Sequence, residues 1–557
     1  MHTVSETTPL AGDAFAIGSG TSSPSCDDSI VAPSASRAIV ADPKAWCQSL
    51  AKRLSWTLLA TIYISHHQLK GLVAGGGDEG LIGKPVEFLF AAQHVPASRL
   101  QAFVTMGLVL PWVAKPLIGF FSDAAPLFGY RKKPYIVMLT ALAIPAYIVL
   151  GLGVVEGQSL TVAALFFASL QVAGTTFLID ARQSEIATKH PGLGPELITF
   201  REMCMNSGML LSALVVGPLI AFAGPRMPYL VALPIAACPL VLALGNWMRE
   251  ERLPAKERGV NVDVLRRSQY TYGLGFLLLP LLLVLACGCV AKLGVEVLAA
   301  VAVFGFMGVT IGYALFVRPE ISRPMIFYFI SQCLSLQING ALFYFLTDSP
   351  AEFPEGPHFS PLVYAGGIST FAVAGRMVGV VSARDLFGQW RYDEALSLTI
   401  PLAACVQLLL VPVILRWNVA WGVPDLLSVL GWTFISKVVC GWRQMSFSLI
   451  LLQATPRGLE ASTLALNSSV ANLGGMISVF FGGFALDVVQ VQPRGQNAES
   501  SSFDGLWKAQ VAAAMLPLLA MPLVPLLVPR CRHNETLVVS EPASATHGAL
   551  AWGCCGA

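Results

Sequence analysis

Charged residues are scarce in this sequence, and their scarcity decides the class of protein. Only 12% of the 557 residues are Asp, Glu, Lys or Arg, whereas an ordinary soluble domain contains roughly 25%. Hydrophobic residues make up 55% of the chain, and the formal net charge of +2 gives no reason to expect a nucleic-acid partner. The composition excludes an ordinary soluble domain and indicates a membrane protein.

Several chemical motifs are also missing. The chain has no Walker-type phosphate loop, which disfavours an ATP-driven pump. His66 and His67 are adjacent but have no matching carboxylate cluster, so neither a metal site nor a membrane-embedded enzyme is expected, and no cofactor is predicted. The twelve cysteines lack paired spacing, and we interpret those within apolar runs as small core residues.

Long apolar runs are what the sequence has in abundance. A hydrocarbon core about 30 Å thick needs roughly 20 apolar residues per helix, and fourteen such runs can be counted. The runs at 272–290 and 293–317 are nearly adjacent, so either both cross as a tight hairpin or one of them does not span. We therefore predict an all-α polytopic membrane protein with two six-helix bundles and about two extra helices between them. The predicted parts are a disordered cytoplasmic tail without a signal peptide (1–50), a first bundle (51–248), a basic cytoplasmic linker (249–271), two extra helices (272–318), a second bundle (319–529) and a cytoplasmic tail (530–557).

The basic residues are distributed unevenly along the chain. If the spans alternate, most of the 35 Lys and Arg residues fall on one side, including Arg131-Lys132-Lys133 and the loop 249–271. The opposite side carries the acidic loop 348–359. An excess of Lys and Arg marks the cytoplasmic side. We therefore place both termini in the cytoplasm, and we expect a plasma membrane location.

One loop pattern occurs in both bundles. Between the second and third spans of the first bundle the sequence reads IGFFSDAAPLFGYRKK, and at the same place in the second it reads VGVVSARDLFGQWRYDE. Gly, Ser, Gly and Arg recur in the same order with nearly the same spacing. This weak internal symmetry favours a duplicated helical bundle, as in many secondary transporters.

Three longer motifs carry a family resemblance. PWVAKPLIGFFSDAAPLFGYRKKPYI (111–136), DARQSEIA (180–187) and PRGLEASTLALNSSVANLGG (456–475) follow one another in order. They resemble the signature of the folate-biopterin transporter family, a branch of the major facilitator superfamily. The resemblance implies a major-facilitator-type 6+6 architecture and a secondary transporter that moves folate, biopterin or a related pteridine by alternating access, with protons as a candidate coupling ion. The alternative is another organic solute, such as an amino-acid-like metabolite or S-adenosylmethionine.

The first motif also predicts a gate. Lys115, Gly119 and Asp123 are four residues apart, so they line one helix face. Asp123 ends the helix, where its charge opposes the helix dipole, and a partner is expected in Arg131, Arg182 or a helix N-terminus of the other half. The resemblance implies that this loop latches the halves together, although it could also act only as a topology signal. The other predicted gating or coupling residues are Asp180, Glu185, Arg376, Glu460 and Asn472.

Polar residues within the spans are the candidates for substrate binding, because such residues are costly in a membrane and usually face the bundle interior. In the first span they form a stripe, Tyr63, His66, His67 and Lys70; the seventh and tenth core spans add Gln332, Gln337, Asn339, Lys437, Arg443 and Gln444. The resemblance implies that these spans line the cavity. Lys437 and Arg443 are expected either to hold substrate carboxylates or to pair with Asp180 or Glu202. Asp180 either takes up a proton or stays ionised beside Arg182 or Arg201.

Overall fold

The computed structural model describes residues 43–77, 79–154, 157–189, 194–254, 258–259, 294–317, 319–453, 460–491 and 502–532. It divides into two compact units, residues 1–50 and 51–557. The predicted tails (1–50 and 530–557), the linker (249–271) and the run 272–290 fall wholly or mostly outside the described residues. Within the described ranges the regular structure is helical, which confirms the all-α class. The second unit contains ten described helices that are long and apolar enough to cross a membrane.

The first half contains four of these long helices, α8 to α11, and its first two predicted spans are divided into shorter helices. The second span is divided because Pro111 and Pro116 lie at the starts of new helices, where a proline needs no N–H partner. The first span changes at Tyr63 from an α-helix into a wider π-helix. Its helices are α3 (Trp56–Ile62), η1 (Tyr63–Val73), α4 (Lys84–Ala91), α5 (Ala97–Leu108), α6 (Leu110–Val113), α7 (Lys115–Ala124), α8 (Lys133–Leu152), α9 (Gln158–Lys189), α10 (Gly194–Ala223) and α11 (Met227–Leu244), and α2 (Pro43–Leu54) precedes them.

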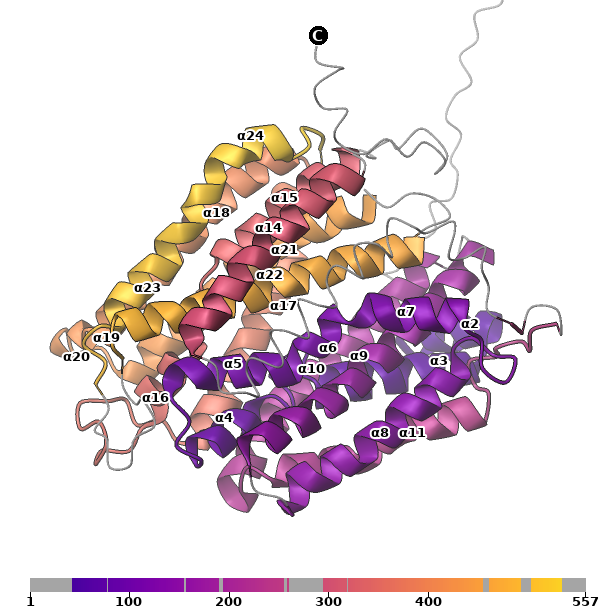
Figure 1. Cartoon of the computed structure of the whole chain (residues 1–557), viewed down its shortest axis with the longest axis horizontal. Coiled ribbons are helices and arrows are strands. Elements are labelled where there is room, and N and C mark those ends of the chain that lie inside the picture. Colours follow the sequence, from indigo (N-terminus) through magenta and orange to yellow (C-terminus); the bar gives the residue numbers. More distant parts are fainter. Residues whose placement is uncertain are drawn as a thin grey trace, which may run out of the picture. The chain divides into compact units, whose positions relative to one another are not determined.

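The second half is built in the same way and is preceded by one described extra helix, α14 (Val295–Phe316). Figure 1 shows α14 beside α15, and the two are in contact. Tyr313 of α14 donates to Asn467 Oδ1 at 2.9 Å, which ties the extra helix to α22. The helices of this half are α15 (Pro319–Leu334), α16 (Asn339–Thr347), η4 (Leu362–Ile368), α17 (Ser369–Phe387), α18 (Tyr392–Leu408), α19 (Val411–Ile414), α20 (Trp417–Ala420), α21 (Asp425–Gln453), α22 (Glu460–Val488), α23 (Leu506–Met515), η5 (Leu516–Leu523) and α24 (Val524–Leu527).

The repeated loop pattern corresponds to a repeated local structure. Ser122 donates to the Gly119 carbonyl at 2.9 Å, and Ser382 donates to the Gly379 carbonyl at 3.3 Å. Both glycines allow close packing: a Cβ atom on Gly119 would lie 2.9 Å from the Phe177 ring, and one on Gly379 would lie 2.3 Å from a backbone oxygen of α21. Small residues permit such helix contacts in membranes. The two halves therefore share this detail as well as their helix order.

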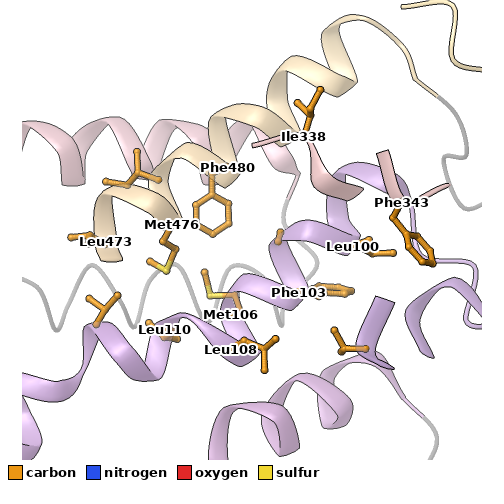
Figure 2. Close-up of a cluster of buried hydrophobic side chains, with 14 of the residues drawn as sticks. Leu100, Phe103, Met106, Leu108, Leu110, Ile338, Phe343, Leu473, Met476 and Phe480 are labelled. Carbon is orange, nitrogen blue, oxygen red and sulfur yellow. The ribbon is translucent and has the colours of Figure 1, made fainter. Parts of the chain in front are cut away.

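An apolar seam joins the halves. Figure 2 shows Met106 of α5 facing Met476 and Phe480 of α22, and all three side chains are buried. At one end of the spans, polar contacts reinforce the seam: the Gln101 amide donates to the Val479 carbonyl at 2.8 Å and accepts from the Gly340 N–H at 3.2 Å. This end also carries the loop 348–359. We call it the outer end, and the end carrying residues 131–133 the inner end.

Helix α10 contacts both halves through glycine. A Cβ atom on Gly208 would lie 2.1 Å from the His67 carbonyl oxygen, so α10 packs directly on the backbone of η1. A Cβ atom on Gly217 would lie 2.6 Å from the backbone nitrogen of Gly366 in η4, which belongs to the other half. The backbones approach this closely because Gly217 has no side chain, whereas a Cβ atom on Gly366 would lie at an ordinary 3.5 Å from the Gly217 Cα atom.

Candidate functional site

A group of polar and charged side chains lies between η1, α9 and α10. His66 Nε2 is 2.9 Å from Asp180 Oδ1, and Arg201 Nη1 lies 3.5 Å from the same oxygen. Arg201 Nη2 donates to Glu202 Oε1 at 2.9 Å. The other ring nitrogen of His66 is 2.8 Å from the Ser65 hydroxyl. Arg201 therefore joins two carboxylates, and hydrogen bonds at both ring nitrogens fix His66.

Three more cations lie within electrostatic range of this group. Lys70 follows His66 by one turn of η1, and its charge interacts with Asp180 and with Arg376 of α17 in the other half. Lys115, the first residue of α7, also interacts with Lys70 and holds its amine 4.1 Å from the centroid of the Trp112 ring. We call His66, Lys70, Lys115, Asp180, Arg201, Glu202 and Arg376 the central charge cluster.

The predicted stripe on the first span is divided in the structure. His66 is fully buried and Lys70 partly buried in the central charge cluster, whereas Tyr63 and His67 form a separate stacked pair with ring centroids 4.5 Å apart. His67 Nδ1 is buried without a hydrogen-bond partner among the described residues. The π-helix changes the angle between successive side chains, and such segments are frequent at functional sites.

The seventh core span is broken where polar residues interrupt it. Helix α15 ends at Leu334 and α16 begins at Asn339, so Gln337 lies in the break. Gln337 Nε2 donates to Ser478 Oγ at 3.2 Å, and Asn339 Nδ2 lies 3.5 Å from Gln337 Oε1. These contacts fix the break against α22, and broken helices in transporters are frequent near binding sites.

The tenth core span, α21, carries three predicted substrate residues. Gln444 Oε1 accepts from the Tyr328 hydroxyl at 3.3 Å, and Gln332 also contacts that hydroxyl. Arg443 is half-buried and lies within electrostatic range of Tyr328. Lys437 lies in range of Glu79 at the outer end. These side chains therefore do not all meet the central charge cluster.

Glu79, a half-buried residue that contacts the other half, was not predicted from the sequence. Its carboxylate accepts from Ser369 Oγ of the other half at 2.5 Å and lies 3.3 Å from Lys84 Nζ. Burial alone would raise the pKa of Glu79, but Lys84, Lys437 and the Ser369 hydroxyl outweigh it and lower the pKa to about 2. The available signal was an acidic residue in the glycine-rich segment AGGGDEG.

A tight turn positions Glu79. The N–H of Ile82 donates back to the Val73 carbonyl at 3.1 Å, so the loop folds onto the end of η1. Gly75 and Gly76 adopt positive φ angles of 61° and 76°, which favour glycine. A Cβ atom on Gly80 would lie 2.3 Å from the nitrogen of Gly75. The glycines therefore let the chain reverse and present Glu79 to the other half.

At the predicted inner gate, Glu185 is the carboxylate that pairs with basic side chains. Lys132 and Arg182 both bind Glu185, with Arg182 at 2.7 Å, and Arg182 also donates to the carbonyls of 248 and 249. Among the described residues Asp123 makes no ion pair with Arg131, Arg182 or any other cation. The charges of Lys132 and Arg131 lie within electrostatic range of Asp123.

Another carboxylate, Glu250, binds at the helix start beside this gate. It accepts from the backbone N–H groups of Arg131, Lys132 and Lys133 at 2.8, 2.9 and 2.9 Å. A carboxylate at a helix N-terminus satisfies unpaired N–H groups and the helix dipole. Two other predicted gating residues lie in α22: Glu460 is its first residue, with a side chain outside the described set, and Asn472 is half-buried. No group of three or more His, Cys, Asp or Glu residues suited to a metal occurs in the described ranges.

Comparison with known proteins identifies the family. The family model described as BT1 family matches residues 77–541, which is well over half of the chain. This chain belongs to the BT1 family. The BT1-family match includes the loop of Glu79, the central charge cluster beyond η1 and all of the second half.

Curated relatives of this BT1-family chain align over most of its length. It is 26% identical over 509 residues to a protein of Arabidopsis thaliana named probable folate-biopterin transporter 6, covering 90% of this chain and 89% of the relative. It is 21% identical over 483 residues to the folate-biopterin transporter of Synechocystis sp., covering 85% and 82%. The sequence similarity therefore extends over most of each chain.

Solved structures agree on the fold. An auto-inhibited POT family peptide transporter superposes with a TM-score of 0.58 at 14% identity, covering 86% of this chain and 98% of the other. A D-xylose-proton symporter superposes with a TM-score of 0.54 at 14% identity, covering 86% and 99%. The BT1-family chain thus has the predicted major-facilitator-type fold and is an integral, multi-pass membrane protein.

Proposed function

We propose that this protein is a secondary transporter that moves folate, biopterin or a related pteridine across a membrane by alternating access. Residues 51–248 and 319–529 are the two moving halves. The names of the curated relatives support the pteridine, and the fold supports the mechanism. The observation that carries the proposal is the central charge cluster, in which Lys70 of the first half lies within electrostatic range of Arg376 from the second half. Charged groups inside a membrane bundle commonly mark a solute pathway.

The contacts between the halves correspond to one conformation of the cycle. Glu79 with Ser369, and Gln101 with Gly340 and Val479, join the halves at the outer end. At the inner end, the ion pairs of Lys132 and Arg182 with Glu185 remain within the first half. This pattern supports a state that is closed at the outer end. Alternating access then requires the outer contacts to break.

Proton coupling, and hence symport, is centred on His66 and Asp180 in this proposal. The two groups share a hydrogen bond of 2.9 Å, and Arg201 keeps a cation beside the carboxylate. A proton on His66 would strengthen its bond to Asp180. Protonation thus changes how firmly η1 is held to α9, which links the proton to a helix contact.

The orientation and membrane follow from the basic residues. The inner end faces the cytoplasm, because the loop 131–133 and the segment 249–271 carry the excess of Lys and Arg. Both termini then lie in the cytoplasm, and we place the protein in the plasma membrane. Two relatives are named chloroplastic. Imaging of a tagged chain would therefore distinguish the plasma membrane from the chloroplast envelope. The protein transports its solute without chemical change.

Uptake measurements test the proposal. The chain is expressed in cells that lack pteridine uptake, and the entry of labelled folate and biopterin is followed with and without a proton gradient. Asp180→Asn should lower uptake at least about tenfold at equal surface abundance, because His66 and Arg201 lose their shared anion. Asp487→Asn, an exposed carboxylate in α22, serves as the control and should leave uptake unchanged. Absence of uptake of both pteridines at confirmed surface expression would refute the function.

A further inference from the structure

The central charge cluster contains more cations than anions. Lys70, Lys115, Arg201 and Arg376 contribute four positive charges, and Asp180 and Glu202 contribute two negative charges; Lys70 interacts electrostatically with all of the other five. Ionisable side chains in a membrane interior are normally paired. With all of these groups ionised and His66 neutral, the surplus is two positive charges, and protonation of His66 adds one more.

The surplus is located on particular side chains. Arg201 already binds both carboxylates, at 3.5 and 2.9 Å. Within the described part of the chain, Lys70 and Arg376 make no ion pair, and the amine of Lys115 lies on the Trp112 ring instead of beside a carboxylate. Holding a cation in a membrane interior without an ion pair carries a free-energy cost. An anion that binds here would remove that cost, whereas a neutral or cationic ligand would not.

The two lysines come from different helices and are close enough to repel each other. Lys70 lies in η1 and Lys115 begins α7, and each interacts electrostatically with Asp180 and Arg201. The ammonium groups of two lysines on separate helices can each hold one carboxylate. A solute with two carboxylates thus matches the net surplus of two charges, and Lys70 and Lys115 offer it cations on two different helices.

We propose, on the basis of the function given above, that the cluster selects pteridines that carry carboxylates over neutral pteridines, and that Lys70 and Lys115 determine this specificity by binding the carboxylates. Folate, whose glutamate moiety carries two carboxylates, is then the preferred substrate class, and biopterin, which carries none, is a weak ligand. The same surplus opposes cationic solutes such as S-adenosylmethionine.

Binding and transport by the purified full-length chain in liposomes test this specificity. Folate should bind at least about tenfold more tightly than biopterin. Lys70→Gln and Lys115→Gln should each weaken folate binding about tenfold or more, the loss expected for a charged hydrogen bond, and change biopterin binding less than about twofold. Lys70→Arg should restore most of the folate affinity. Lys508→Gln is the matched control, because Lys508 also lies over a tryptophan ring, that of Trp507, but in α23 and outside the cluster.

A second measurement does not depend on substrate. Because Lys70 makes no ion pair among the described residues, Lys70→Gln should raise the melting temperature of the substrate-free protein by about 2–4 °C, while Lys508→Gln should not change it. A lower melting temperature for Lys70→Gln would overturn the proposed charge surplus. Equal binding of both pteridines, with Lys70→Gln weakening both alike, would overturn the specificity but leave pteridine transport intact. If the folded protein binds and transports neither pteridine, the proposed function itself fails.

Discussion

Removal of the Glu79 carboxylate should open the outer end of the transporter. Glu79 accepts from Ser369 of the other half at 2.5 Å, whereas its partner Lys84 belongs to its own half. Replacement by glutamine keeps the shape of the side chain and removes the charge. We therefore expect Glu79→Gln to shift the conformational equilibrium toward a state with the outer end open.

The size of the effect follows from the pKa of Glu79. A fall from 4.5 to about 2 corresponds to about 3 kcal/mol in favour of the ionised form, at 1.36 kcal/mol per pKa unit. The share due to Lys84 persists when the halves separate, because Lys84 moves with Glu79. The contacts with Ser369 and Lys437 are lost, and a hydrogen bond to a charged group contributes about 1.5–3 kcal/mol, which shifts the ratio of open to closed molecules about 10- to 150-fold.

Distances between spin labels can measure this shift. Ala92 and Ala420 are exposed residues at the outer ends of the two halves, and cysteines introduced there, in a background without the native cysteines, carry the labels. Glu79→Gln should increase the fraction of long distances. The control is Glu352→Gln, since Glu352 accepts from the Ser349 hydroxyl at 2.8 Å within one loop. An unchanged distance distribution in Glu79→Gln would refute Glu79 as an outer gate.

The pH dependence of this gate has a definite sign. Because the pKa of Glu79 is lowered in the closed state, its contribution is complete above about pH 4.5 and is lost only as the pH falls toward 2. The label distances in the unsubstituted protein should therefore show no contribution from Glu79 between pH 5 and 8. A transition in that range that disappears in Glu79→Gln would contradict the assigned pKa.

Three other substitutions test the packing. Glu250→Ala should lower the free energy of unfolding by about 1–2 kcal/mol, because three backbone N–H groups lose their acceptor; thermal unfolding in detergent measures this, and an unchanged midpoint would contradict it. Gly482→Ala should abolish transport, because a Cβ atom there would lie 1.9 Å from the Gln337 carbonyl oxygen; wild-type uptake would show that the helix break can shift. Gln101→Leu should leave the buried Gly340 N–H unpaired, at about 1–3 kcal/mol, and therefore lower the unfolding temperature, which a thermal shift assay would detect.

The all-α class and the two similar halves can be predicted from the sequence, because a membrane requires long apolar runs and small residues at close helix contacts. Apolar runs of the required length give the spans, and the recurrent glycine and serine give paired contacts at Ser122 and Ser382. The sequence does not predict the break before Asn339 or the π-helix from Tyr63 to Val73. Both lie within apolar runs. The hydrophobicity of a run indicates that it lies in the membrane, but not which backbone hydrogen bonds it forms.

The candidate site could be predicted only in part. His66, Lys70 and Asp180 are recognisable as polar residues in apolar surroundings, and the structure brings them together. Arg201 was considered only as one partner for Asp180, although in the structure it joins two carboxylates. Glu79 lies in a loop, where carboxylates are common, and its importance depends on a contact with a residue 290 positions away. Pairings of this kind require the tertiary arrangement.

The contact between Gly217 and Gly366 has a consequence for the speed of transport. Helices that interlock through side chains must change rotamers or separate before one can slide over the other. At this contact one backbone packs directly on another, so no side chains interlock. The energy barrier to sliding at this contact should therefore be low. The rate of turnover should then be set by the polar contacts that break at the outer end. A larger residue at Gly217 would introduce a side chain into this contact and should slow the exchange between the two conformations.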